Sequence, residues 1–280
     1  MALATPIFQR SPLTQYYFNI WHWQSRKWNL RIRGLLYALS FWSILFFGLP
    51  YSIAAEQTRA DFVKRAKRIF DRSQAAYQRD TNNVDTAWQF ARATFDLANQ
   101  ATKSSERAEI AQQGIAVARQ AVAMASNSAP AHYYLGMNLA QLAQTKFLGA
   151  LKIVNEMERE FSIVRNLDAK FDDAGADRNL GLLYRDAPAI GSIGSRPKAR
   201  EHLQNAVKLA PESPDNRLNL IDTYLKWGET ESAKKELQAL EEMWPRARAN
   251  LNGEQWESSW PDWEARLKKA KGKLTASVAR

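Results

Sequence analysis

The stretch of this sequence that comes closest to a chemical motif is YRDAPAIGSIGSRPKAREHL, residues 184–203. It places Gly191 and Gly194 shortly before a basic residue, and glycine-rich loops of this kind can hold phosphate groups. A Walker loop, however, requires G-x-x-x-x-G-K-[ST] between a strand and a helix. Three residues separate Gly194 from Lys198 here, and the preceding sequence is helical in pattern. We therefore interpret the stretch as a connector between two helices.

Other residue types that catalyse reactions or bind metals are sparse. The sequence has no cysteine, which excludes disulfides, thiolate metal sites and cysteine nucleophiles. No H-E-x-x-H, G-x-S-x-G or serine–lysine motif occurs. We expect His132 to be packed in the core and His202 to pair with Glu201 in solvent, and the adjacent carboxylates Asp172 and Asp173 would point to different helix faces. The sequence therefore predicts no catalytic residues, no metal site, no cofactor and no enzymatic activity.

The charge of the chain is unevenly distributed. Its 280 residues carry a net charge of +10, from 39 basic and 29 acidic side chains. Residues 1–55 hold five of the basic side chains and no acidic one, so half of the net charge belongs to this segment. Further along, charges of both signs alternate, as in AKKELQALEE. A nucleic-acid interface would need a clustered basic face, so we predict no nucleic-acid partner.

Residues 1–55 have the order of parts that is typical of a secretory signal peptide. Basic residues between positions 26 and 33 come first, an apolar run at 35–49 follows, and small residues up to Ala55 end the segment. An uncleaved signal anchor in the membrane is the alternative. In both cases the positive charges precede the apolar run, so the rest of the chain would cross the membrane. We predict that residues 56–280 are periplasmic or secreted, or are held outside the cytoplasm by an inner-membrane anchor.

After residue 56 the apolar residues recur at helical intervals. Phe62, Ala66 and Phe70 are four positions apart and would share one face of a helix. Strand-like alternation is absent, and only 12 glycines and 10 prolines interrupt the chain. The sequence therefore predicts an all-α fold, in which the segment 56–84 contributes an N-terminal helix.

A repeat of small and large residues runs through the chain at a fixed interval. Leu135 follows the small residue Ala121 by fourteen positions, and Leu220 follows Ala206 by the same interval. Leucine–glycine pairs occur at 135–136 and 180–181. Small residues are required where two helix backbones approach closely, so the pattern predicts antiparallel helical hairpins stacked on one another.

The repeat resembles that of the tetratricopeptide repeat (TPR) family, through the two leucine–glycine pairs and the residues Ala199, Ala206, Pro211 and Ala233. The resemblance implies a superhelix of hairpins in which no repeat buries its apolar face alone. We assign TPR-like repeats to residues 85–243, with hairpins near 85–126, 129–171, 174–210 and 214–243. Residues 244–280 would form a C-terminal capping helix, at about 259–271, and a basic tail.

A narrower resemblance comes from the connector and its flanking helices. Ala199 follows Tyr184 by fifteen positions, where the repeat pattern expects about nine. The run from Gly175 to Gly228, with its APAIGSIG turn, is similar to the TPR component associated with tripartite ATP-independent periplasmic (TRAP) transporters. That resemblance implies an association with a periplasmic solute-binding protein or a small apolar ligand, and a homo-oligomer. The chain departs from the lipoprotein form of that group because it has no cysteine to lipidate.

The function predicted from these features is a non-enzymatic, exported scaffold that binds a protein or peptide. The alternative is a TRAP-transporter accessory that handles a small apolar ligand. In a TPR-like superhelix the first helix of each hairpin lines the concave face, which places eight candidate partner-binding residues there: Tyr133, Tyr134, Met137, Arg178, Asn179, Arg185, Asn219 and Lys226. Replacing Tyr134 and Arg178 together would then weaken partner capture with little loss of thermal stability.

The C-terminal segment is rich in tryptophan, at positions 244, 256, 260 and 263. We interpret these residues as the core that caps the last repeat. An aromatic patch for a partner or a membrane surface is the alternative, since the basic end from Arg266 to Lys273 could favour anionic lipid.

Overall fold

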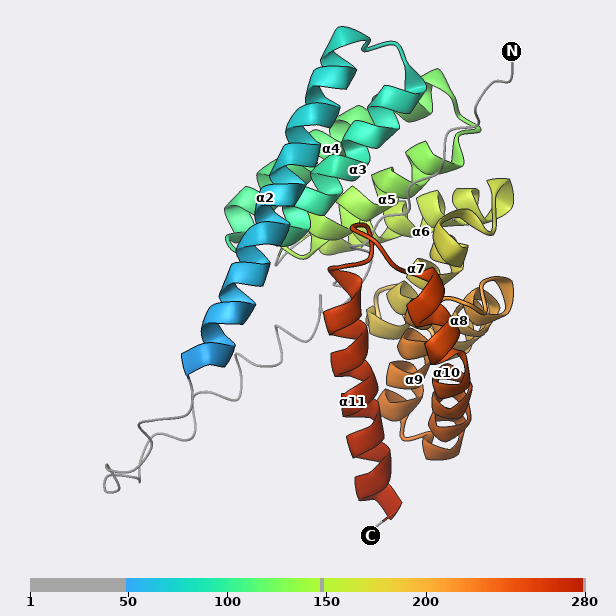
Figure 1. Ribbon diagram of the computed structural model, residues 1–280. Coiled ribbons are helices and arrows are strands. Elements are labelled where there is room, and N and C mark those ends of the chain that lie inside the picture. The colour runs from blue at the N-terminus through green and yellow to red at the C-terminus, as the bar shows by residue number, and fades with distance from the viewer. Residues whose placement is uncertain (1–48, 147–148, 279–280) are drawn as a thin grey trace, which may run out of the picture.

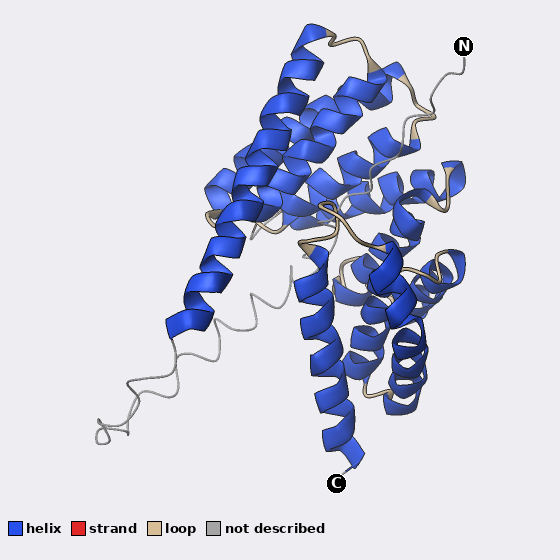
Figure 2. Cartoon of the chain, viewed as in Figure 1, coloured by secondary structure: helices blue, strands red, loops and turns tan. Residues whose placement is uncertain are grey.

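The computed structural model describes residues 49–146 and 149–278, and in this part of the chain every regular element is an α-helix (Figures 1 and 2). The all-α prediction is thus confirmed for these residues. The apolar run of the predicted signal or anchor segment lies outside them, except for its last residue. The ten helices are α2 (Leu49–Arg79), α3 (Val84–Gln100), α4 (Ser104–Met124), α5 (Ala129–Ala143), α6 (Ala150–Leu167), α7 (Phe171–Asp186), α8 (Arg196–Leu209), α9 (Pro214–Trp227), α10 (Thr230–Asn250) and α11 (Ser259–Val278).

Eight of these helices form four consecutive antiparallel hairpins, α3–α4, α5–α6, α7–α8 and α9–α10. Their bounds follow the ranges expected from the fourteen-residue interval, although α10 continues to Asn250. The long helix α2 packs against α3, and α11 packs against α9 and α10. Figure 1 shows the hairpins following one another in chain order from α2, with α11 beside α9. Among the described residues, no helix is both long and apolar enough to span a bilayer.

Local sequence signals explain where the helices begin and end. The side chain of Asn83 caps α3 by accepting hydrogen bonds from the backbone N–H groups of Asp85 (2.9 Å) and Thr86 (3.2 Å). Helix α9 begins with Pro214, whose missing N–H is not needed in a first turn. It ends at Gly228, which has φ +76°, a left-handed conformation that glycine adopts without steric cost.

Glycine allows two of the closest helix contacts. A Cβ atom added to Gly114 of α4 would lie 2.2 Å from both Asn138 Oδ1 and Thr94 Oγ1. One added to Gly181 of α7 would lie 2.6 Å from Cγ of Leu203 in α8. These are the close approaches that the small residues of the repeat predict, and larger residues fill the space between hairpins.

The C-terminal tryptophans belong to the core of the last hairpin. Trp256, Trp260 and Trp263 are buried in one cluster with side chains of α9 and α10. The rings of Trp260 and Trp263 meet edge to face with centroids 4.9 Å apart, and Trp244 meets Trp260 at 5.4 Å. This arrangement supports the capping interpretation of the tail over the exposed aromatic patch.

The glycine-containing stretch joins α7 to α8, as the connector interpretation predicts. Its conformation is fixed by hydrogen bonds from Ser195 N to the Tyr184 carbonyl (2.9 Å) and from Gly194 N to the Pro188 carbonyl (3.0 Å). Ile190 lies in this connector with 95% of its surface exposed. A helix rather than a strand precedes the turn, so its backbone context differs from that of a Walker loop.

Candidate functional site

Five of the eight predicted partner-binding residues lie in the protein interior. Tyr133, Tyr134 and Met137 of α5 and Arg178 and Asn179 of α7 are at most 2% exposed. The prediction placed them on an open concave face, but α5 is packed against α3, α4, α6 and α7, so nearly all of its residues are buried. A partner could not reach these five side chains in this conformation.

Arg178 connects three hairpins through one guanidinium group. Its Nη1 donates to the backbone carbonyls of Asp172 (3.2 Å) and Asp173 (3.3 Å) and to Oδ1 of Asn216 (3.1 Å). Its Nη2 donates to Oδ2 of Asp172 (2.7 Å) and to the hydroxyl of Tyr133 (3.3 Å). These partners come from α5, α7 and α9. We refer to Arg178 and its partners, together with Asn179, as the Arg178 network: Tyr133, Asp172, Asp173, Arg178, Asn179 and Asn216.

The network holds an unusual turn at the start of α7. Asp172, Asp173 and Ala174 have φ values of 52°, 55° and 59°, which are left-handed. This conformation costs roughly 1–2 kcal/mol per residue for L-amino acids other than glycine. Two of the carbonyls that accept from Arg178 belong to this turn, so the arginine stabilises a backbone that the local sequence alone would disfavour.

The electrostatics of the Arg178 network keep the arginine charged and the tyrosine neutral. Burial alone would lower the pKa of Arg178, but the neighbouring Tyr133 and Asp172 raise it above its ordinary value. Burial raises the pKa of the Tyr133 hydroxyl well above its usual range, and the charge of Asp172 raises it further. Tyr133 therefore remains a hydrogen-bond donor to Asp172, at 2.6 Å.

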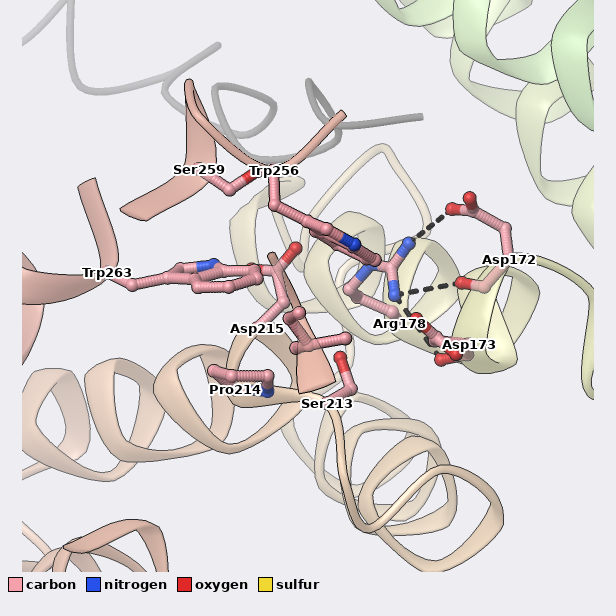
Figure 3. Close-up of a pocket in the computed structure, with 10 residues that line it drawn as sticks. Asp172, Asp173, Arg178, Ser213, Pro214, Asp215, Trp256, Ser259 and Trp263 are labelled. Atoms are coloured by element: carbon pink, nitrogen blue, oxygen red, sulfur yellow. Dashed lines mark hydrogen bonds and ion pairs between the residues drawn. The ribbon is translucent and has the colours of Figure 1, made fainter. Parts of the chain in front are cut away.

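A small enclosed cavity lies beside the Arg178 network (Figure 3). Its volume is about 20 Å³, which is room for about one water molecule and too little for an organic ligand. The Nε of Arg178 and the Nε1 of Trp263 have no hydrogen-bond partner in the described part of the chain. The lining residues are Asp172, Asp173, Arg178, Ser213, Pro214, Asp215, Leu251, Trp256, Ser259 and Trp263. We interpret this site as structural.

Asn219, another predicted partner-binding residue, contacts the chain's own C-terminal helix. Arg266 of α11 donates from Nη2 to Oδ1 of Asn219 (2.8 Å) and to Oδ2 of Asp222 (2.8 Å). Its Nη1 lies 3.3 Å from Oδ1 of Asp215. Helix α11 of the same chain therefore covers the polar face of α9.

The junction of α9 and α11 contains a carboxyl group with a raised pKa. Burial, together with the charges of Asp215 and Asp222, raises the pKa of Asp262 to about 6 against the opposing charge of Arg266. Between about pH 4 and pH 6, the folded state therefore keeps a proton on Asp262 that the unfolded chain has already released. The stability from this proton is present at low pH and is lost as the pH rises through 6.

We expect the Asp262→Asn variant to be more stable than the unmodified protein at pH 8, by about 1–2 kcal/mol. Asparagine cannot ionise, so the penalty for a partly buried charge disappears. At pH 4 the two proteins should be equally stable. Urea unfolding at both pH values measures the difference, and Asp61→Asn, at an exposed position of α2, is the matched control. A variant less stable at pH 8 would contradict this account.

The remaining predicted residues, Arg185 and Lys226, lie at the surface near the ends of α7 and α9. Lys226 is exposed and its Nζ lies 2.6 Å from Oδ1 of Asp186. Arg185 is half-buried and pairs with the other carboxylate oxygen of Asp186, also at 2.6 Å. Only this pair among the eight predicted residues keeps access to solvent.

A second surface cluster, which the sequence interpretation did not identify, lies beside them. Arg196 and Arg200 are one turn apart on α8, and their guanidinium carbons lie 4.7 Å and 5.2 Å from the centre of the Trp227 ring. Arg200 also donates two 2.7 Å hydrogen bonds to the carboxylate of Glu229. Hydrogen bonds from Arg200 and Arg196 lower the pKa of Glu229 to about 2.

The arginines of this cluster line an open surface groove of about 390 Å³ along α8. The lining residues are Arg196, Pro197, Arg200, Glu201 and Gln204. The four-residue spacing of the two arginines on a helix was a visible signal in the sequence, but their meeting with Trp227 of the next hairpin depends on the tertiary fold. We refer to Arg196, Arg200 and Trp227, with this groove, as the arginine–tryptophan groove.

The two histidines of the described region pair with buried carboxylates. His132 Nδ1 lies 2.6 Å from Oε2 of Glu160, and its Nε2 lies 2.9 Å from the Ser126 carbonyl. His202 Nδ1 lies 2.7 Å from Oδ1 of Asp177. His132 is thus packed in the core as predicted, whereas His202 pairs with Asp177 rather than with Glu201. Over the residues that the structure describes, no cluster of three or more potential ligands could hold a metal ion.

Two family models match parts of the chain. Residues 194–249 match the tetratricopeptide repeat model, over α8 to α10. Residues 54–152 match the model described as regulator of microtubule dynamics protein 1-3, over α2 to the start of α6. No curated protein matches the chain.

Solved structures similar to this chain include a TPR protein. The crystal structure of TTC0263, a thermophilic TPR protein of Thermus thermophilus, has a TM-score of 0.54 and 15% sequence identity, and the match covers 79% of this chain and 94% of that one. A crystal structure of MamA has a TM-score of 0.46 and 18% identity, covering 71% of this chain and 96% of that one. The TPR-type helical fold, which is consistent with protein–protein interaction, is thus supported by the repeat model and by the likeness to TTC0263.

Proposed function

We propose that this protein is a non-enzymatic scaffold that binds a partner protein through the arginine–tryptophan groove. The observation that carries the proposal is the open groove along α8, whose two arginines, Arg196 and Arg200, also lie against the ring of Trp227. Arginine and tryptophan are the residue types that most often dominate binding energy at protein interfaces. The guanidinium groups are held in place by an aromatic ring, which reduces the entropy lost on binding.

The proposed bound part of the partner is an acidic segment, which would displace Glu229 from Arg196 and Arg200. Besides Arg196 and Arg200, the exposed Lys226 lies at the end of α9, next to Trp227. Glu229 already shows how a carboxylate fits between the two arginines.

The proposal includes export across a membrane, as the signal-like residues 1–55 indicate. A TRAP-associated role that handles a small apolar ligand is the alternative. The cavity in Figure 3 gives this alternative little support, because its volume of about 20 Å³ is far below the several hundred Å³ of typical ligand sites.

A filament is a third kind of partner, because residues 54–152 match the family model described as regulator of microtubule dynamics protein 1-3. A filament would meet the exposed side chains of Lys64, Arg68 and Arg72 on α2.

Affinity capture of the full-length protein from the cells that produce it tests the proposal. We expect the Arg196→Glu/Arg200→Glu variant to recover at least about tenfold less of the main protein partner, because two arginine contacts at an interface centre are lost. The tagged protein itself should be found in the periplasmic or membrane fraction. Mass spectrometry identifies the partner as an acidic protein, a solute-binding protein or a filament protein.

The matched control is Lys103→Glu/Lys152→Glu, which reverses the same number of charges at exposed positions, one just before α4 and one in α6. It should leave recovery unchanged, and circular dichroism should show both variants folded. Equal recovery with both variants would show that the groove does not bind the partner.

A further inference from the structure

The two ends of this superhelix touch one another, which is unusual for stacked repeats. In a solenoid each repeat normally contacts only its neighbours. Here the segment Leu251–Ser258, which joins α10 to α11, contacts α2 at the other end of the stack. We refer to this segment as the strap, and Figure 1 shows it at the start of α11.

Ionic contacts join the strap to α2. Arg65 Nε lies 3.2 Å from Oε1 of Glu254, and Arg65 Nη1 lies 3.8 Å from Oε2 of Glu257. Arg68 Nη2 lies 3.2 Å from the same oxygen of Glu254. Arg65 also donates to the backbone carbonyl of Glu254. Two arginines one turn apart on α2 therefore face two glutamates of the strap.

The other side of the strap rests on the Arg178 network. Trp256 is 7% exposed and lines the small cavity, and Figure 3 shows its indole ring alongside the guanidinium of Arg178. Trp260 Nε1 donates to the Leu251 carbonyl at 2.6 Å, which fixes the start of the strap. Gly253, between these anchors, has φ +91° and no neighbour within 4 Å of an added Cβ atom.

We propose that the strap is an ionic clasp that closes the superhelix, and that it opens when its pairs with α2 are broken. The carboxylates are exposed, at 62% for Glu254 and 63% for Glu257, so salt screens the contacts. The contacts with α2 are polar, whereas Trp256 is buried on the opposite side. The α2 side therefore separates first, and the opening uncovers the faces of α2 and of the strap that meet in the closed form.

Two spin labels can measure the closure directly, because the chain has no cysteine of its own. Labels at Arg72→Cys of α2 and Gln255→Cys of the strap, both exposed positions, report the distance by pulsed electron paramagnetic resonance in the full chain. We expect one short distance at low salt. At about 1 M salt, where the Debye length is about 3 Å, or in Arg65→Glu/Arg68→Glu, a longer distance should appear, with the open-to-closed ratio raised about tenfold.

Two controls keep the result interpretable. The label pair Arg72→Cys and Gln89→Cys joins α2 to its neighbour α3, and its distance should not change with salt or with the charge reversal. Adding Glu254→Arg/Glu257→Arg to the reversed α2 should restore the short distance. An unchanged distance between α2 and the strap in Arg65→Glu/Arg68→Glu would overturn the proposal, as would a failure of the charge swap to restore closure.

Discussion

The Arg178→Met variant is expected to lose about 3–5 kcal/mol of its free energy of unfolding. Methionine is long enough to fill much of the space, but it leaves the buried carboxylate of Asp172 without its cation. It also removes the donors to the carbonyls of the left-handed turn and to Asn216. Urea unfolding followed by circular dichroism measures the change.

Arg119→Met is the matched control, because Arg119 makes a single ion pair with Glu156 and its side chain is 56% exposed. We expect a loss below about 1 kcal/mol there. A similarly small loss for Arg178→Met would mean that the Arg178 network contributes little to the fold. It would also restore the possibility that Arg178 serves a partner rather than the core.

The Gly114→Ala variant is expected to lose about 2–4 kcal/mol, even though alanine is a better helix former than glycine. The added methyl group would overlap the side chains of Asn138 and Thr94. Asn138 is fully buried and donates 2.8 Å hydrogen bonds to the carbonyls of Ala91 and Tyr134, so moving it breaks bonds that water cannot replace. Thermal and urea unfolding both report the loss.

The same substitution at Gly272 of α11 should have the opposite sign. Gly272 is an exposed helix residue with nothing within 4 Å of an added Cβ atom, so alanine should stabilise the protein by about 0.5–1 kcal/mol. If Gly114→Ala also stabilised the protein, that result would contradict the close packing of α4 against α3 and α5 at Gly114.

The hairpins could be predicted from the sequence because their signals are local and periodic. Ala121 and Ala206 are small residues that each precede a leucine by fourteen positions. They mark contacts between helices that recur along the repeat and do not depend on which protein is bound. Capping residues and prolines then set the helix ends to within a few positions. The connector after α7 could also be recognised, since its extra length interrupts the period.

The candidate site could not be predicted in the same way, because its geometry depends on contacts between distant residues. Arg178 and Asn216 are 38 positions apart, and Arg178 and Tyr133 are 45 apart. No periodic signal indicates that other helices cover α5 on all sides. No such signal indicates that Asp172, Asp173 and Ala174 form a left-handed turn. Tyrosine, arginine and asparagine on the first helix of a hairpin look the same in sequence whether they face solvent or a buried network.

The Arg178 network also bears on how the protein unfolds. A linear array whose units touch only their neighbours can fray from either end, one hairpin after another. A single guanidinium that binds α5, α7 and α9 at once cannot lose one of these helices without weakening its hold on the other two. The central and last hairpins are therefore linked into one cooperative unit, and partial melting of the stack at that point is suppressed.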